Sequence, residues 1–355
     1  MPHVDLRFFA VLLASSLCLA GFGPPGAGPA RAEAQVIEWA AHTRGRMIDV
    51  FDAEASPEHL VAMGLTMMQL ARATYDHGEA GRARKTEAAR FDYERFVVRE
   101  RVSAQAVVSR DREHAVVAIR GSSHVADWFF DAMVIDERAS RFRGAHQGFA
   151  WLSEALLPRV RDQLDRLRRD GVEHVWLTGH SLGGAMAQIM AQDLDRRGYP
   201  VEGVFAFGAP AVGKETWSSI YRLPGRTHLF ELEGDLVPCL PPNQAQWQKN
   251  GHLHRIRDDG RVELYAFSDV CAARIPEAAF GRPVCDAPSR VRRALAVFAP
   301  HTRLMCETPD PLRALADVLA DALNGNRHSR HSPSVYQTHL RLGREETATR
   351  LIGHY

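Results

Sequence analysis

Residues 179–183, Gly-His-Ser-Leu-Gly, stand between an apolar run at residues 175–178 and a segment with helical spacing of apolar residues. This order predicts a strand, a sharp turn and a helix. In such a turn the serine backbone is strained, and the two glycines let the strand and the helix pass closely. Ser181 is therefore the candidate nucleophile, and the Leu182 N–H lies where a tetrahedral oxyanion would form. The alternative is a tight strand–helix turn with a buried serine.

Strands and helices alternate on both sides of this turn. We expect helices at residues 57–75, 151–169, 310–323 and 334–342, the last beginning after a polar loop. Buried strands are expected at 203–210 and 227–238, and hairpins from two β-rich runs, 96–109 and 115–120, and from 255–267 with its turn at Asp258-Asp-Gly260. Residues 76–90 read as a loop or a frayed helix. The alternation predicts an α/β fold with a mostly parallel sheet, helices on both faces, and sites at the carboxyl ends of the strands.

Asp235 comes just beyond the strand that begins near residue 227, so it is expected at the same sheet edge as Ser181. A serine nucleophile needs a base that takes its proton and a carboxylate that orients the base. We assign the carboxylate to Asp235, with Glu233 as the alternative. His180, inside the pentapeptide, is interpreted as a packing residue.

The N-terminal residues 1–34 have the pattern of an export signal. Basic residues precede an apolar stretch from Phe8 to Ala20, and Ala32-Glu-Ala34 offers a cleavage site. We expect removal of this segment, a periplasmic or secreted protein and no membrane span after cleavage; a retained anchor is the alternative. Residues 35–355 are then expected to form a single domain.

Export changes the meaning of the cysteines. Removal of residues 1–34 would take away Cys18 and leave an even number, Cys239, Cys271, Cys285 and Cys306. In an oxidising compartment these favour two disulfides, with three pairings open and buried free thiols as the alternative.

The composition limits the partners. The 355 residues carry a formal net charge of +1, which gives no electrostatic reason to bind nucleic acid. No Cys/His spacing is typical of a zinc site; His252 and His254 could share one face of a strand, but we expect no metal and no cofactor.

With these motifs in order, the chain resembles the class 3 lipases, the fungal-type lipases and their bacterial relatives in the α/β-hydrolase superfamily. The resemblance covers about residues 90–267 and the last thirty residues. It is carried by residues 118–123 with Asp127-Trp128, by His146-Gln-Gly-Phe149, Gly179–Gly184, Phe207–Pro210 and Gly234–Pro238. The stretch at about 268–325, which contains three cysteines, is longer than the family core and is expected to be a C-terminal insertion.

The resemblance implies further site residues. Ser122 is expected to supply a second oxyanion donor. The alternative is that Ser122 caps its turn and has no part in catalysis. Residues 123–131 correspond to the family's lid, and their apolar side chains either cover an acyl site or pack as core: Val125, Trp128, Phe129 and Phe130.

Because members of the superfamily place the triad in the order Ser, Asp, His, the base must follow Asp235. The candidates are His252, His254, His301, His328, His331, His339 and His354. His331-Ser-Pro-Ser-Val-Tyr336 precedes a closing helix and resembles the His-Ser-x-x-x-Tyr of bacterial members, although Arg330 replaces the usual preceding Asp. We assign the base to His331, with His328 and His339 as alternatives.

The resemblance implies an exported serine ester hydrolase that acts on lipid or other acyl esters, and we expect it to meet its substrate at an interface. A phospholipase A1 or an acyltransferase would share every catalytic residue. A catalytically silent lipid-binding protein is the alternative outside enzymes, and its sequence would have lost a triad member.

Overall fold

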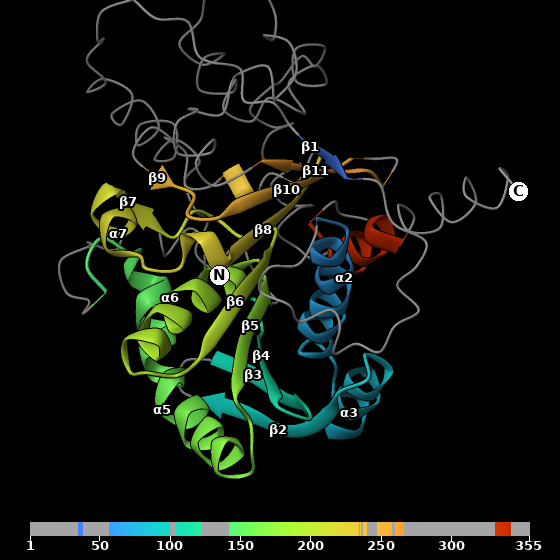
Figure 1. The fold of residues 1–355 in the computed structure, drawn as a ribbon, viewed down its shortest axis with the longest axis vertical. Coiled ribbons are helices and arrows are strands. Elements are labelled where there is room, and N and C mark those ends of the chain that lie inside the picture. Colours follow the sequence, from blue (N-terminus) through green and yellow to red (C-terminus); the bar gives the residue numbers. More distant parts are fainter. Residues whose placement is uncertain are drawn as a thin grey trace, which may run out of the picture.

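The computed structural model describes residues 35–37, 57–99, 104–122, 142–233, 235, 237–239, 247–257, 260–265 and 331–341. Within these residues one large sheet has the strand order β1-β11-β10-β8-β6-β5-β4-β3-β2 (Figure 1). Its strands are β1 (Gln35–Ile37), β2 (Asp92–Arg99), β3 (Ala104–Asp111), β4 (His114–Ile119), β5 (His174–His180), β6 (Val201–Phe207), β8 (Thr227–Leu232), β10 (His252–Ile256) and β11 (Val262–Tyr265). The five central strands, β10, β8, β6, β5 and β4, run parallel to one another. Antiparallel strands complete both edges.

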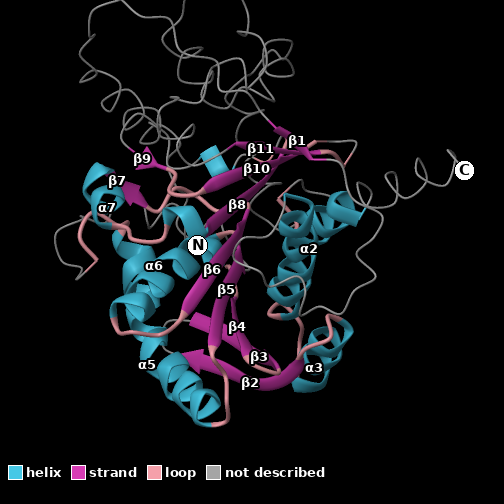
Figure 2. Ribbon diagram, in the orientation of Figure 1, coloured by secondary structure: helices cyan, strands magenta, loops and turns pink. Residues whose placement is uncertain are grey.

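Helices cover both faces of this sheet (Figure 2). On one face lie α5 (Gln147–Arg169) and α6 (Leu182–Arg196). The opposite face carries α2 (Pro57–Ala73), α3 (Glu79–Ala88) and a closing helix at residues 333–341. The remaining described elements are short: β7 (Gly213–Lys214), α7 (Glu215–Ile220), the 3-10 turns at Pro224–Arg226 and Val237–Cys239, and β9 (Trp247–Gln248).

The alternation of side chains along the strands divides the core into two layers. In β6, Phe205 and Phe207 belong to the cluster that α2 and the closing helix cover. Val204 belongs to the cluster under α5 and α6. The central strands are therefore buried on both faces, which explains why they are almost continuously apolar in sequence.

Most of the expected elements are confirmed. α2 starts at Pro57, the first residue of the helix expected at 57–75. The elbow strand and helix flank Ser181, and β10 and β11 form the predicted antiparallel hairpin.

Two expectations need correction. The β-rich run at 96–109 is two strands, because β2 and β3 pair antiparallel, with Val97 opposite Ala106, so the chain reverses within the run. Residues that favour strands occur on both sides of the reversal, and composition does not mark it. Residues 76–90 contain a regular helix, α3, whose Thr86 is buried. Lys85 and Asp76 pair at 2.7 Å beside it; this packing supports a helix that the charged sequence alone did not indicate.

Several expectations fall outside the described residues. These are the export signal at 1–34, the insertion at 268–325, the lid side chains Val125, Trp128, Phe129 and Phe130, the alternative bases His301, His328 and His354, and the side chains of all four remaining cysteines. Among the helices that the structure describes, none has the length and apolar character needed to cross a membrane.

Candidate active site

Ser181 occupies the sharp turn between β5 and α6. Its backbone has φ 58° and ψ −131°, in the left-handed region that residues with a side chain rarely adopt. Its N–H donates to the Phe207 carbonyl at 2.8 Å, which ties the turn to the end of β6. A Cβ atom on Gly179 would lie 2.3 Å from the Gly183 backbone, so only glycine fits there. The turn thus has the strain and the close strand–helix approach that the pentapeptide predicted.

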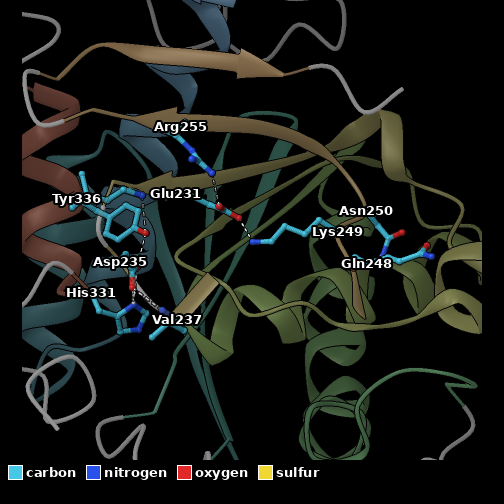
Figure 3. A network of polar contacts seen from close by, with 10 residues as sticks. Glu231, Asp235, Val237, Gln248, Lys249, Asn250, Arg255, His331 and Tyr336 are labelled. Atoms are coloured by element: carbon cyan, nitrogen blue, oxygen red, sulfur yellow. Dashed lines mark hydrogen bonds and ion pairs between the residues drawn. The ribbon is translucent and has the colours of Figure 1, made fainter. Parts of the chain in front are cut away.

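Asp235 and His331 meet at the carboxyl end of the sheet (Figure 3). His331 Nδ1 lies 2.9 Å from Asp235 Oδ2 and 3.1 Å from Oδ1. Both residues are buried. The Asp235 carboxylate can only accept, so His331 Nδ1 carries the hydrogen. Nε2 is then the unprotonated nitrogen of a neutral imidazole. The structure thus brings together two residues that lie 96 positions apart in the chain.

Two further hydrogen bonds fix the carboxylate. Tyr336 donates its hydroxyl to Asp235 Oδ2 at 2.6 Å and accepts the Leu232 N–H at 3.0 Å (Figure 3). Val237 N–H donates to Asp235 Oδ1 at 3.0 Å. Burial, and then the Asp235 charge, hold the pKa of Tyr336 well above its usual value, so its hydroxyl remains a donor. Both carboxylate oxygens therefore have partners besides the imidazole.

Gly208 leaves room for this pair. Its φ is +56°, and a Cβ atom there would lie 2.8 Å from Asp235 Oδ2 and 3.2 Å from His331 Cε1. A side chain at this turn would push the acid and the histidine apart. The glycine of Phe207-Gly-Ala-Pro210 is thus required by the site.

The chain after β4 passes directly beside the nucleophile. A Cβ atom on Gly121 would lie 3.3 Å from Ser181 Cβ. The adjacent residue, Ser122, is partly buried. Leu182 is the first residue of α6 and is buried. The backbones of Ser122 and Leu182 therefore approach Ser181 from two different elements.

The alternative candidates that the structure describes lie elsewhere. Glu233 pairs with Arg257 at 2.9 Å, and its side chain is 41% exposed. His339 is within the closing helix, where Nδ1 lies 2.9 Å from the Val335 carbonyl. His252 and His254 belong to β10, the strand that pairs with β8. None of these side chains joins the Asp235–His331 pair.

His180 is not only a packing residue, because its side chain contacts the Tyr75 hydroxyl and the His331 ring. Its Nδ1 lies 3.2 Å from the Tyr75 hydroxyl, and its ring lies 4.6 Å from the His331 ring, centroid to centroid. Burial, and then the nearby His331, lower the pKa of His180 well below its usual value, against the opposite effect of the His331 backbone. Sequence reasoning missed Tyr75 because it lies 105 residues from His180 and no motif contains both.

A buried ion cluster is centred on Glu231 of β8, the strand that ends shortly before Asp235. Glu231 pairs with Lys249 and lies 3.8 Å from Arg255, with all three side chains about 10% exposed or less (Figure 3). Among the described residues, one group has metal-ligand types close together, Glu113, Glu173 and His174. It lies at the amino ends of β4 and β5, at the sheet edge opposite Ser181, and is largely exposed.

Comparison with known proteins finds similarity to lipases in one part of the chain. Residues 116–245 match the model of the family described as Lipase (class 3). The chain is 32% identical over 141 residues to the secreted mono- and diacylglycerol lipase A of Penicillium cyclopium, covering 38% of this chain and 45% of that enzyme. It is 29% identical over 170 residues to phospholipase A1-II 1 of Oryza sativa subsp. indica, covering 40% and 41%. Each alignment therefore spans less than half of the relative's length.

The fold agrees as well. A solved Rhizomucor miehei lipase–propeptide complex superposes with a TM-score of 0.51 at 20% identity, covering 63% of this chain and 77% of that chain. Together with the parallel central strands and the helices on both faces, this likeness identifies an α/β-hydrolase fold. The family match covers residues 116–245, which include the elbow and the acid loop, so this part of the chain is similar to the class 3 lipases.

Proposed function

We propose that this protein is a serine ester hydrolase of lipid or related acyl esters, with Ser181, His331 and Asp235 as its triad. The observation that carries the proposal is the buried Asp235–His331 pair at the sheet edge where the strained Ser181 turn ends β5. The relatives described as lipases add support, over less than half of their length.

In this mechanism Ser181 Oγ attacks the acyl carbonyl carbon while His331 Nε2 takes the hydroxyl proton. Asp235 holds the Nδ1–H tautomer and stabilises the imidazolium that forms. The N–H groups of Leu182 and Ser122 stabilise the oxyanion. His331 then returns the proton to the leaving alcohol, and water releases the acid from the acyl-enzyme by the same steps in reverse.

The substrate class is proposed from the relatives and the apolar lid sequence. A secreted mono- and diacylglycerol lipase and a phospholipase A1 are both similar to this chain, so glycerolipid esters are the expected substrates. Val125, Trp128, Phe129 and Phe130 are proposed to form a lid that opens at a lipid interface. Acyl transfer would use the same residues and differs only in whether water or an alcohol reaches the acyl-enzyme.

Export and the two disulfides stay part of the proposal. The relative described as secreted is consistent with export of this chain. The His-Ser-x-x-x-Tyr pattern at 331–336 favours a bacterial member of the family.

A phosphonate that reacts with activated serines tests the mechanism. It should label Ser181 in the wild-type mature chain, which should also hydrolyse p-nitrophenyl esters. His331→Ala should lose at least about 10³-fold in kcat and label far more slowly. His339→Ala is the matched control from the closing helix and should keep near-normal activity. Labelling of another serine, or a loss in His339→Ala with an active His331→Ala, would overturn the assignment.

Assays against phospholipid and against triacylglycerol dispersions then separate the substrate classes. A phospholipase A1 releases the sn-1 acyl chain from phospholipid, whereas a triacylglycerol lipase leaves phospholipid largely intact. Product analysis with an added alcohol distinguishes acyl transfer, because the acyl chain then appears on the alcohol.

A further inference from the structure

One tyrosine hydroxyl connects two parts of the candidate site from behind. Tyr75 follows the end of α2, and its hydroxyl accepts the Gly121 N–H at 3.1 Å. The same hydroxyl lies 3.2 Å from His180 Nδ1. Gly121 precedes the proposed oxyanion donor Ser122, and His180 precedes the proposed nucleophile Ser181. A residue outside every sequence motif thus contacts the neighbours of both.

The directions of these hydrogen bonds follow from counting hydrogens. The Gly121 N–H can only donate, so it occupies a lone pair of the Tyr75 oxygen. The hydroxyl has a single hydrogen, and among the described residues His180 Nδ1 is its one hydrogen-bonding acceptor. The opposite direction would leave that hydrogen without an acceptor in the described part of the chain. His180 Nδ1 is therefore the acceptor, and its neutral ring carries the hydrogen on Nε2.

The His180 ring continues this connection to the base. It lies 4.6 Å from the His331 ring at an interplanar angle of 38°. The centroids of the His180 and Tyr336 rings are 5.7 Å apart, and the two rings are T-shaped to each other at 76°. Burial lowers the pKa of His180, which keeps the ring neutral beside an imidazole that must become cationic during turnover. A charged neighbour at this distance would oppose that step.

The loop at residues 120–122 packs closely against Tyr75 and His180. A Cβ atom on Gly121 would lie 2.3 Å from the Tyr75 hydroxyl oxygen and 2.5 Å from the His180 carbonyl oxygen. The Arg120 guanidinium lies 5.5 Å from the Tyr75 ring centroid, and it donates to Gln105 at 2.7 Å. The backbone at Gly121 is thus held from two sides, with Tyr75 as its side-chain acceptor.

We propose that Tyr75 and His180 are positioning residues, which together hold the loop at residues 120–122 and the His331 ring in register around Ser181. Gly121 N–H donates to Tyr75, and Tyr75 donates to His180, whose ring supports His331. This inference rests on the proposed function, since the register matters for the oxyanion and for proton transfer. Both residues act through their neighbours, Tyr75 through Gly121 and His180 through the His331 ring.

Tyr75→Phe tests the connection at its centre. It removes the acceptor for Gly121 and the donor to His180 and keeps the ring. We expect kcat on a p-nitrophenyl ester to fall about 10–100-fold with KM changed less than about 2-fold, because misplaced donors weaken transition-state stabilisation. Tyr221→Phe is the matched control, because its buried hydroxyl bonds Thr227 at 2.7 Å near the opposite end of β8. It should lower the melting temperature without lowering kcat.

Two His180 variants distinguish the hydrogen-bond acceptor at Nδ1 from the volume of the side chain. Asn places an oxygen where Nδ1 stood, whereas Leu fills the space without an acceptor. His180→Asn should therefore be at least about 3-fold more active than His180→Leu. Adding Tyr75→Phe to His180→Leu should cost less than it does in the wild type, because the two residues act through one hydrogen bond. Full additivity, or an equal kcat loss in Tyr221→Phe, would overturn the proposal.

Amide hydrogen exchange at Gly121 reads the connection without turnover. Protection of this amide should drop at least about 10-fold in Tyr75→Phe and stay unchanged in Tyr221→Phe. Unchanged protection in Tyr75→Phe would refute the positioning role even in an active enzyme. If the wild type hydrolyses no ester and Ser181 is not labelled, the proposed function fails, whereas loss of protection would still show that Tyr75 holds this loop.

Discussion

Buried histidines occur in two places, beside the carboxyl ends of the central strands and within strands β8 and β10. At the carboxyl edge, His331 pairs with the carboxylate of Asp235 at 2.9 Å. In the interior, His228 of β8 pairs with another imidazole, His254 of β10, at 3.0 Å, and the His254 ring stacks on Phe230 at 4.3 Å. The partner of His331 is a carboxylate, which stabilises a positive charge on the imidazole. In the His228–His254 pair, neither imidazole provides a negative charge for the other. The partner, more than the burial, decides which imidazole can take a proton.

The two interior histidines have low pKa values. Burial, and then the neighbouring His252, lower the pKa of His228 to about 3. Burial and the two adjacent imidazoles lower the pKa of His254 well below its usual value. His228 and His254 are therefore neutral core side chains at physiological pH.

The largest expected effect comes from making the catalytic pair resemble the interior one. Asp235→Asn replaces the carboxylate with a neutral partner of the same shape. We expect kcat to fall about 10³–10⁴-fold, because the tautomer is no longer fixed and the imidazolium is no longer stabilised. Steady-state kinetics and a thermal melt would check this. A melting temperature close to the wild type combined with an active enzyme would mean that another carboxylate, such as Glu233, orients the base.

A smaller effect is expected one contact further out. Tyr336→Phe removes the 2.6 Å hydrogen bond to Asp235 and leaves the Leu232 N–H without its acceptor. A hydrogen bond to a charged group contributes about 1.5–3 kcal/mol, so kcat should fall roughly 10–100-fold. Burst kinetics with a p-nitrophenyl ester would assign the loss to acylation or deacylation. A variant as active as the wild type would show that Val237 and His331 suffice to hold the carboxylate.

The smallest expected effect concerns stability in acid. The unfolded chain titrates histidines near pH 6.5, whereas the folded pKa of His228 is about 3. Below about pH 6.5 the unfolded state therefore binds more protons, so the free energy of unfolding should fall as the pH drops toward about 3. Its full contribution is present above about pH 6.5.

His228→Gln sharpens this prediction, because the amide can still hydrogen bond to His254 but does not titrate. Urea unfolding at pH 7 and pH 4.5 should show a cost of about 1 kcal/mol at neutral pH but a smaller loss on acidification than in the wild type. His339→Gln, outside the interior group, is the matched control. An unchanged acid loss in His228→Gln would place the acid-sensitive groups elsewhere.

The sequence by itself determined the local parts of this protein. The strained turn at Ser181 follows from two glycines at fixed spacing, and α2, the central strands and the β10–β11 hairpin follow from periodicity and turn residues. Asp235 was found because a strand ends just before it. These features depend on residues that are neighbours in the chain, so their physical cause can be read without the fold.

Tertiary structure decided the rest. Only packing brings His331 to Asp235 across 96 residues, and Tyr75 to His180 across 105, and no local preference encodes either distance. The sequence resemblance included Tyr336 and Gly208 without showing that one donates to the carboxylate and the other leaves space for it. Composition likewise did not divide β2 from β3 or form α3, because strand pairing and burial of Thr86 are long-range contacts. Chain reversals and contacts between distant side chains depend on the whole sheet, and they decide how the site is held.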